Sequence, residues 1–313
     1  MKIGIIGTGA FGIALSKVLS SFNEVIMWSK FEEEKEELAK YRENKKYFPG
    51  ITIDETVKFT TDLRALRQTE IVIIAVPFIA IRELVLNKEL WFENQIICST
   101  TKGIDEEEFK TTTQILEEGL NTRRVTAITG PTFAIDVAIG QNVHMMLGYL
   151  QEADAEAIYN LFKGTNIKLH KTIDLNGIQI AGVLKNAIAI GSGILEGLNS
   201  SNSVKASYVT NALQELSSII ENLGFDSKTA YTYAGIGDLI LTCTSENSRN
   251  FTFGKLIGQN YSVLQAFEKM GSKTVEGYKI IEVLHNKFNF ELINTLYDII
   301  YLGADKEKLE KII

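Results

Sequence analysis

The sequence predicts an α/β domain with a mostly parallel sheet, followed by an all-helical domain. Short β-branched segments alternate with helical patterns over the first half of the chain, as is typical of a parallel sheet. After about Thr172, helical patterns follow one another with hardly a strand between them. A chain of 313 residues, 45% of them hydrophobic, is long enough for two domains. We expect these domains at residues 1–172 and 173–313.

Apolar periodicity gives the order of the elements. The expected strands of the first half lie at residues 3–6, 25–28, 71–76, 95–99 and 125–128, with a helix through Ile13–Leu19 after the first. The expected helices of the second half lie at residues 178–195, 206–223, 253–257 and 275–285. The acidic cluster 32–37 has the mixed charges of a solvated helix face, and we assign it no function.

Composition excludes several classes of function. The chain has 39 acidic and 32 basic residues, so its net charge of −7 provides no attraction to nucleic acid or anionic membranes. The apolar stretch from Ile71 to Ile81 contains Pro77 and is shorter than the roughly 20 residues that span a bilayer. The N-terminus lacks the pattern of a signal peptide. We therefore expect a cytoplasmic protein without an integral membrane segment, acting on a small molecule.

The two cysteines give no sign of a metal site or a disulfide framework. Cys98 and Cys243 lie far apart, outside any spacing typical of zinc ligands. We expect both to be reduced packing residues, and we expect no metal.

A glycine-rich motif follows the first strand and opens the first helix. Gly7 permits a tight turn, Gly9 lets a pyrophosphate approach the backbone, and Gly12 lets helix and strand pack closely. The helix N-terminus adds N–H donors. Because strand, turn, helix and second strand occur in the order of a βαβ unit, the motif predicts dinucleotide binding rather than a plain turn.

The end of the second strand leaves the choice of dinucleotide open. An acid that holds the ribose 2′-hydroxyl of NAD is expected about 20 residues after such a motif, but the strand ends with Ser29-Lys30. Lys30 suits the 2′-phosphate of NADP, although a surface lysine at a strand end is equally common. Glu32 can instead turn inward to the ribose of NAD. We therefore expect NADP(H), NAD(H) or both.

The loops after the later strands are where an open α/β sheet places its ligands. Lys102 follows a buried strand, amid hydroxyl residues and before Gly103, which favours a site role over that of an exposed loop lysine. The segment Gly130–Ala134 follows the next strand.

Lys185 is a single lysine inside an otherwise apolar helix. Burial disfavours a charged ammonium, so a lysine at such a position can exchange a proton with a carbonyl or alcohol. The alternative is a lysine that extends to the surface. The small and polar neighbours of Lys185 favour the role of general acid/base.

A later segment combines an aspartate with a polar cluster. Asp238, between Gly237 and an apolar run, is expected in a glycine turn, where it can orient a lysine ammonium. Ser248, Arg249 and Asn250 offer a hydroxyl, a guanidinium and an amide to a phosphate. Taken alone, such a cluster is more often a helix cap.

Taken together, these motifs resemble the NAD(P)-dependent glycerol-3-phosphate dehydrogenase family, bacterial type, over essentially the whole chain. The matching segments are GTGAFG, NKKYFPG (44–50), STTKG, GPTFA, LKNAIAIGSG (184–193), AGIGDLILTCTSENSRN and VEGY (275–278). The resemblance implies a Rossmann domain followed by a helical domain like the C-terminal domain of 6-phosphogluconate dehydrogenase. The implied activity is reversible reduction of dihydroxyacetone phosphate to sn-glycerol 3-phosphate for glycerophospholipid synthesis. For the oligomeric state, we consider a homodimer.

The resemblance also implies roles for individual residues. Lys185 would exchange the proton, Lys102 would stabilise the developing oxyanion, and Asp238 would hold Lys185. Substrate contacts are implied for Lys102, Gly130, Thr132, Lys185, Asp238, Ser248, Arg249 and Asn250. Cofactor contacts are implied for Gly7, Gly9, Ala10, Phe11, Gly12, Lys30, Lys102, Ala134, Arg249 and Glu276. The family often has serine at the positions of Ala10 and Thr132; Thr132 keeps the hydroxyl, whereas Ala10 loses one possible phosphate hydrogen bond.

The sequence leaves two other interpretations to compare. A hydroxyacid or 6-phosphogluconate-type dehydrogenase shares the two-domain plan and a helical lysine, but the segment at 234–250 argues against it. A catalytically silent dinucleotide sensor is disfavoured because Lys102, Lys185, Asp238 and Arg249 are all present.

Overall fold

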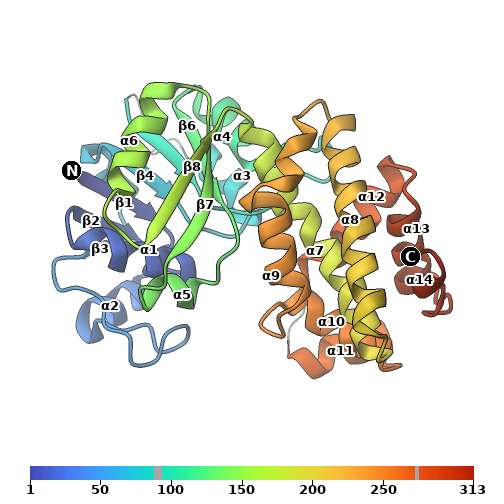
Figure 1. The fold of residues 1–313 in the computed structure, drawn as a ribbon. Helices are drawn as coiled ribbons and strands as arrows, with labels where there is room; N and C mark the ends of the chain where they lie inside the picture. The colour runs from blue at the N-terminus through green and yellow to red at the C-terminus, as the bar shows by residue number, and fades with distance from the viewer. Residues whose placement is uncertain (88–93, 272–274) are drawn as a thin grey trace. The chain divides into compact units, whose positions relative to one another are not determined.

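The computed structural model describes residues 1–87, 94–271 and 275–313, which form two compact units (Figure 1). Unit 1 is Met1–Gln179 and unit 2 is Ile180–Ile313, so the division falls inside helix α7 (Leu175–Gly197) rather than at Thr172. The first residues of α7 belong to unit 1 because they bond to it. Thr111 donates a 2.7 Å hydrogen bond to the Asn176 side chain, and Gln179 donates one of 2.6 Å to Thr113.

Unit 1 is built on one eight-stranded sheet in the order β3-β2-β1-β4-β5-β6-β7-β8. Its strands are β1 (Lys2–Ile6), β2 (Glu24–Trp28), β3 (Lys58–Thr60), β4 (Ile71–Ile74), β5 (Ile96–Ser99), β6 (Val125–Thr129), β7 (Val143–Tyr149) and β8 (Ile167–Thr172). All neighbouring strands are parallel except β6 and β7, which confirms the mostly parallel sheet. The sequence analysis did not predict β3, β7 or β8.

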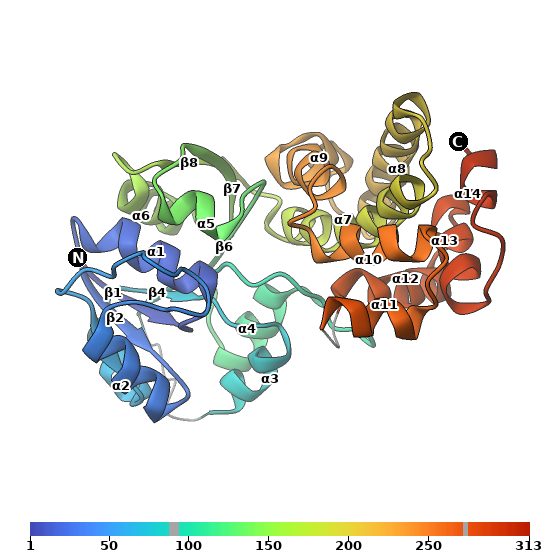
Figure 2. The ribbon, with the colours of Figure 1, turned by 90° about the horizontal axis from the view of Figure 1, so that it is seen from below.

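Helices cover both faces of this sheet. They are α1 (Ala10–Ser20), α2 (Glu32–Tyr41), a 3₁₀ helix (Leu63–Gln68), α3 (Ile79–Leu86), α4 (Thr112–Leu120), α5 (Ala134–Ala138) and α6 (Glu152–Phe162). Figure 2 shows α1 beside α5 on one face and α3 beside α4 on the other. Strand β4 is therefore buried on both sides, and all four of its residues are 0% exposed. This explains its continuous apolar sequence, without the alternation of a half-exposed strand.

Unit 2 consists of helices, and the residues described in it include no strand. After α7 come α8 (Asn202–Asn222), a 3₁₀ helix (Ser227–Tyr231), a π-helix (Tyr233–Gly237), α9 (Asp238–Cys243), α10 (Arg249–Gly258), α11 (Val263–Met270), α12 (Glu276–Lys287), α13 (Glu291–Tyr301) and α14 (Lys308–Lys311). The expected helices correspond to α7, α8, α10 and α12, so the helical class of the second half is confirmed. Helices α9, α11, α13 and α14 were not predicted.

Helix α7 is the core helix of unit 2. Among the described helices, it is also the one that is long and apolar enough to cross a membrane. The sequence-based test for a membrane span considered Ile71–Ile81 and not this helix. The apolar window of α7 is, however, 100% buried inside the protein. Its hydrophobicity is accounted for by packing in the core.

Glycines let α7 and α10 approach closely. A Cβ atom added at Gly193 would lie 2.1 Å from the carbonyl oxygen of Phe251, and one at Gly254 would lie 1.9 Å from that of Ile190. Both distances are far inside van der Waals contact, so larger residues would force the helices apart. This contact fixes α10 against the helix that carries Lys185.

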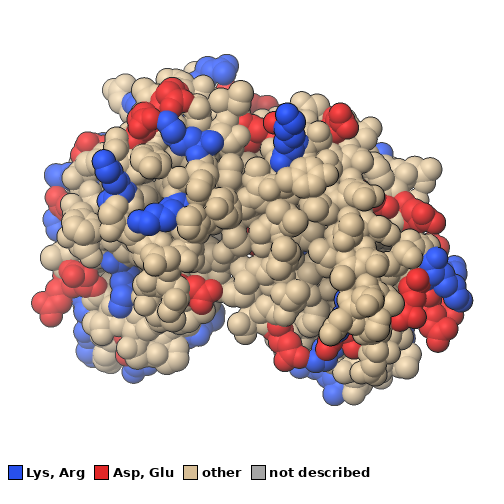
Figure 3. All heavy atoms as spheres, in the orientation of Figure 1, with Lys and Arg blue, Asp and Glu red and all other residues tan. Residues whose placement is uncertain are grey.

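Charged side chains are interspersed on the surface. On the face in Figure 3, basic and acidic groups adjoin one another over the region of α6. Lys171 of β8 pairs with Glu152 and Glu156 of α6. Cluster 32–37 forms the first turns of α2, and its glutamates other than Glu34 are exposed, as expected for a solvated face.

Glu215 on α8 provides a test of the packing of unit 2. Its Oε1 accepts a 2.8 Å hydrogen bond from the Leu292 N–H, while Oε2 is buried and accepts none within the described chain. Burial raises the pKa of this carboxyl group. The folded state therefore binds the proton more tightly than the unfolded state, and this contribution to stability is lost as pH rises through the raised pKa.

We expect the melting temperature of Glu215→Gln minus that of the wild type to increase as pH rises from about 4 to about 7. The wild type loses the contribution of the protonated carboxyl group over this range, whereas glutamine does not titrate. Thermal unfolding followed by circular dichroism measures the difference. Glu221→Gln, at an exposed position of the same helix, is the matched control. A difference that stays constant with pH would contradict the prediction.

Candidate active site

The glycine-rich loop between β1 and α1 has the shape of a pyrophosphate site. Gly7 has φ +114°, in the region that favours glycine, and a Cβ atom at Gly12 would lie 2.2 Å from the Gly7 carbonyl oxygen. A Cβ atom at Gly9 would meet nothing within 4 Å, and Gly9 is the N-cap of α1 without a side-chain cap. Open space before an uncapped helix N-terminus, beside Ala10 and Phe11, fits the phosphates of a dinucleotide.

A cavity of about 520 Å³ adjoins this loop. It is lined by Gly7 and Gly9, by Lys30 after β2, and by Val76 after β4. These residues all follow the carboxyl ends of parallel strands, where open α/β sheets bind their ligands. We therefore take this cavity, named the nucleotide cavity below, as the candidate cofactor site.

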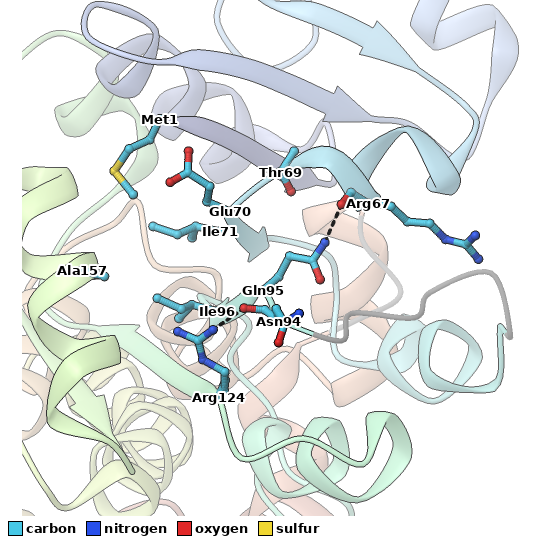
Figure 4. Close-up of a pocket in the computed structure, with 10 residues that line it drawn as sticks. All are labelled: Met1, Arg67, Thr69, Glu70, Ile71, Asn94, Gln95, Ile96, Arg124 and Ala157. Carbon is cyan, nitrogen blue, oxygen red and sulfur yellow. Dashed lines mark hydrogen bonds between the residues drawn. The ribbon is translucent and has the colours of Figure 1, made fainter.

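A larger cavity of about 860 Å³ lies at the opposite edge of the sheet (Figure 4). Met1, Ile71 and Ile96 line it, near the amino ends of β1, β4 and β5. Arg124 extends into it and also pairs with the buried carboxylate of Asp154, at 2.6 Å. This edge is not where such sheets bind nucleotides, so we do not place the active site there.

Acids that were not predicted from the sequence line the nucleotide cavity. Lys30 forms a 2.7 Å ion pair with Glu83 of α3, and both line the cavity. Glu34, the half-buried glutamate of cluster 32–37, lines it too. Glu32, the expected alternative, instead accepts a 2.7 Å hydrogen bond from Thr61 and pairs with Lys35. Spacing does not single out Glu34, since Glu32, Glu33 and Glu34 lie 20, 21 and 22 residues after Gly12.

Two further loops at this edge of the sheet carry expected site residues. Lys102 follows β5 in a loop held to its neighbour, because Thr101 donates a 2.8 Å hydrogen bond to the Val76 carbonyl. A Cβ atom at Gly103 would lie 2.3 Å from the Phe78 side chain, so the two loops pack tightly.

The second loop follows β6. Gly130 packs against β7, where an added Cβ atom would lie 2.9 Å from the Met145 Cα. Thr132 donates a 3.1 Å hydrogen bond to the Phe133 carbonyl, and Ala134 begins α5. Lys102, Gly130, Thr132 and Ala134 thus share one edge of the sheet with the glycine-rich loop.

Unit 2 contains a buried ion pair. Lys185 of α7 is 7% exposed, and its ammonium pairs with the carboxylate of Asp238, which is 0% exposed. Asp238 begins α9 directly after the π-helix Tyr233–Gly237, rather than lying in a glycine turn as expected. Such wide turns are frequent at functional sites. A buried pair of this kind keeps a proton donor inside the protein without leaving its charge uncompensated.

Beside this pair, amide side chains connect three helices. Asn186 of α7 accepts a 3.0 Å hydrogen bond from Asn250 of α10 and donates one of 3.0 Å to Glu276 of α12. The side-chain amide oxygen of Asn250 accepts a 2.9 Å hydrogen bond from the Gly277 N–H. The structure thus brings Asn250 and Glu276 together through Asn186, a residue that the sequence analysis did not assign to the site.

The remaining members of the polar cluster lie at the start of α10. Ser248 is the N-cap and accepts a 3.3 Å hydrogen bond from the Phe251 N–H, so helix capping, the alternative considered above, does occur. Arg249 lies 3.5 Å from Glu276, and both side chains are more than half exposed. The Arg249 guanidinium is therefore accessible to a ligand.

The cysteines and histidines have other surroundings. Burial raises the pKa of both the Cys98 and the Cys243 thiol to about 12. His144 and His170 contact each other at 2.9 Å on β7 and β8. Among the residues that the structure describes, no three or more His, Cys, Asp or Glu side chains are grouped to hold a metal ion.

Comparison with known proteins gives the same family for both units. The model described as NAD-dependent glycerol-3-phosphate dehydrogenase N-terminus matches residues 2–155, and that of the C-terminus matches residues 174–311. The glycerol-3-phosphate dehydrogenase [NAD(P)+] of Fusobacterium nucleatum is 34% identical, covering 93% of this chain and 89% of the relative. The enzyme of the same name from Staphylococcus haemolyticus is 32% identical, and the match covers 96% of this chain and 93% of the relative.

A solved structure agrees. The crystal structure of glycerol-3-phosphate dehydrogenase from Coxiella burnetii has a TM-score of 0.89 at 26% identity, covering 99% of this chain and 98% of that one. The fold class and the resemblance stated above are thereby confirmed. With both family models matched and relatives above 30% identity over nearly the full length, this chain belongs to the NAD(P)-dependent glycerol-3-phosphate dehydrogenase family.

Proposed function

We propose that the protein is a glycerol-3-phosphate dehydrogenase that reversibly reduces dihydroxyacetone phosphate to sn-glycerol 3-phosphate with NAD(P)H. The observation that carries this proposal is the buried pair of Lys185 and Asp238 in a chain of this family. The product would supply glycerophospholipid synthesis. Within this proposal the enzyme works in the cytoplasm, and a homodimer is the assembly to test by sedimentation.

Lys185 acts as the proton donor in the direction of reduction. When bound, the nicotinamide supplies a hydride to the substrate carbonyl carbon. The Lys185 ammonium gives its proton to the carbonyl oxygen as negative charge develops there, and accepts it back in the reverse reaction. Asp238 orients the ammonium and compensates its charge in the buried site. Lys102 supplies a second positive charge to the developing oxyanion.

The phosphate of the substrate is held by the start of α10. Arg249 exchanges its exposed, weak contact with Glu276 for a charge-assisted bond to the phosphate. Gly130, Thr132, Ser248 and Asn250 complete the proposed substrate contacts. Asn250 donates one amide hydrogen to Asn186, and its amide nitrogen carries a second for the phosphate.

The dinucleotide is held mainly by unit 1. Gly7, Gly9, Ala10, Phe11 and Gly12 form the phosphate loop, where backbone N–H groups serve in place of a serine at position 10. The other proposed cofactor contacts are Lys30, Lys102, Ala134, Arg249 and Glu276.

A change of substrate tests the proposal. Purified protein should oxidise NAD(P)H, followed by loss of absorbance, when dihydroxyacetone phosphate is added. Dihydroxyacetone lacks the phosphate that Arg249 binds, so it should be reduced at least about 100-fold less efficiently in kcat/KM. A panel of 2- and 3-oxoacids, which a hydroxyacid dehydrogenase would reduce with the same cofactor, is the matched comparison. Equal efficiency with and without the phosphate, or activity on the oxoacids alone, would contradict the proposal.

A further inference from the structure

We propose that Glu34 is a specificity-determining residue that makes this protein prefer NADH to NADPH. Its carboxylate would accept a hydrogen bond from the 2′-hydroxyl of the adenosine ribose and repel a phosphate at the same position. The inference rests on the proposed function only in taking the nucleotide cavity as the dinucleotide site.

Two hydroxyl groups hold the Glu34 carboxylate in place. The Thr8 side chain, within the glycine-rich loop, and the Ser29 side chain, after β2, each donate a 2.6 Å hydrogen bond to its Oε2. Thr8 is 5% exposed and Ser29 is 1% exposed, so both donors are fixed by their surroundings. The carboxylate thus bridges the phosphate loop and the end of β2, the two segments between which a dinucleotide-binding fold places the adenosine ribose.

The other oxygen of the carboxylate is available to a ligand. Glu34 lines the nucleotide cavity, and its Oε1 accepts no hydrogen bond from the residues that the structure describes. A ribose hydroxyl supplies the donor that this oxygen lacks. Hydrogen bonds to ionised acceptors are the stronger kind, so this contact favours a nucleotide with a free 2′-hydroxyl.

The charges around the cavity oppose a 2′-phosphate. The charged residues that line it are Lys30, Glu34 and Glu83, two acids against one base. Lys30, the residue expected to read a 2′-phosphate, is paired with Glu83 at 2.7 Å. A phosphate monoester carries a charge of about −1.5 to −2 at neutral pH. It would therefore enter a region whose own charges sum to −1.

The Lys30 pair alone would not decide the preference. Its side chains are 54% and 68% exposed, and exposed pairs are weak, so Lys30 can leave Glu83 for a phosphate. Glu83 would then lose its ion pair with Lys30. The Glu34 carboxylate, held in place by the Thr8 and Ser29 hydroxyl groups, would still repel the phosphate. Glu34 is therefore the group that sets the direction of the preference, opposite to the one that Lys30 alone suggests.

Nucleotide binding without substrate tests this inference. Trp28, one of the two tryptophans of the chain, lines the cavity, so quenching of the tryptophan fluorescence reports binding in separate titrations with NADH and with NADPH. We expect the wild type to bind NADH at least about tenfold more tightly, the effect of one charged hydrogen bond gained and one like charge avoided. Glu34→Gln keeps an oxygen for Thr8 and Ser29 but loses the charge, and it should reduce this ratio by about tenfold.

Three variants make the result specific. Glu32→Gln, on the same helix but held by Thr61 and Lys35, should leave the ratio unchanged. Lys30→Ala should change the ratio less than Glu34→Gln does. If Glu34→Gln fails to fold, Ser29→Ala removes one of the two donors that hold the carboxylate and should lower the ratio in the same direction.

Equal or tighter binding of NADPH by the wild type, or an unchanged ratio in Glu34→Gln, would overturn the inference. Selective NADH binding by a protein that does not reduce dihydroxyacetone phosphate would contradict the proposed function and support this inference. The two proposals therefore fail on different measurements.

Discussion

Lys185→Met should lower kcat for dihydroxyacetone phosphate by about 10²- to 10⁴-fold, the usual effect of removing a general acid. Methionine has a similar length but no proton to give, so the oxyanion would form without a donor. The affinity for NADH should stay the same, because Lys185 lies on α7 in unit 2, outside the segments that line the nucleotide cavity. Steady-state kinetics and the fluorescence titration measure the two quantities on the same preparation.

The matched control is Lys205→Met on α8. Lys205 also pairs with an acid, Glu196 at 2.8 Å, but its side chain is 27% exposed, compared with 9% for that of Lys185. This variant should keep normal turnover. Near-normal turnover of Lys185→Met would instead reduce Lys185 to a packing residue and remove the central step of the proposed function.

Features that depend on local sequence were predictable from the chain alone. The phosphate loop needs glycine at Gly7 for its positive φ and at Gly12 for close packing, and these requirements act within a few residues. The strand β4 and the helix α7 are short and long apolar segments respectively, and burial on all sides gives such segments few alternatives. The division into an α/β half and a helical half follows from these signals.

Features that depend on distant contacts were not predictable in the same way. Glu34 has the same local sequence signature as the exposed glutamates around it, and only the positions of Thr8 and Ser29 turn it into the cavity. Asn186 joins residues 64 and 90 positions away in the chain. The antiparallel pairing of β7 with β6 is likewise set by topology, because strand direction leaves no mark in a short apolar segment.

Asp238→Asn should lower the free energy of unfolding by about 3–5 kcal/mol, the usual effect of removing one partner of a buried ion pair. Asparagine keeps the shape of the side chain, so the loss comes from removing the negative charge of Asp238 beside the buried Lys185 ammonium. Urea unfolding followed by circular dichroism measures the change. Glu196→Gln is the matched control, because the Lys205–Glu196 pair is partly exposed and should contribute at most about 1 kcal/mol.

A double variant separates stability from chemistry at this site. Replacing both partners, in Lys185→Met/Asp238→Leu, removes both buried charges, so it should recover most of the stability that Asp238→Asn loses. It should remain as inactive as Lys185→Met, because the proton donor is still missing. Recovery of stability without recovery of turnover would show that the pair is retained for proton transfer rather than for folding. If Asp238→Asn unfolds like the wild type, the Lys185 ammonium does not depend on Asp238 for compensation, and the positioning role of Asp238 is wrong.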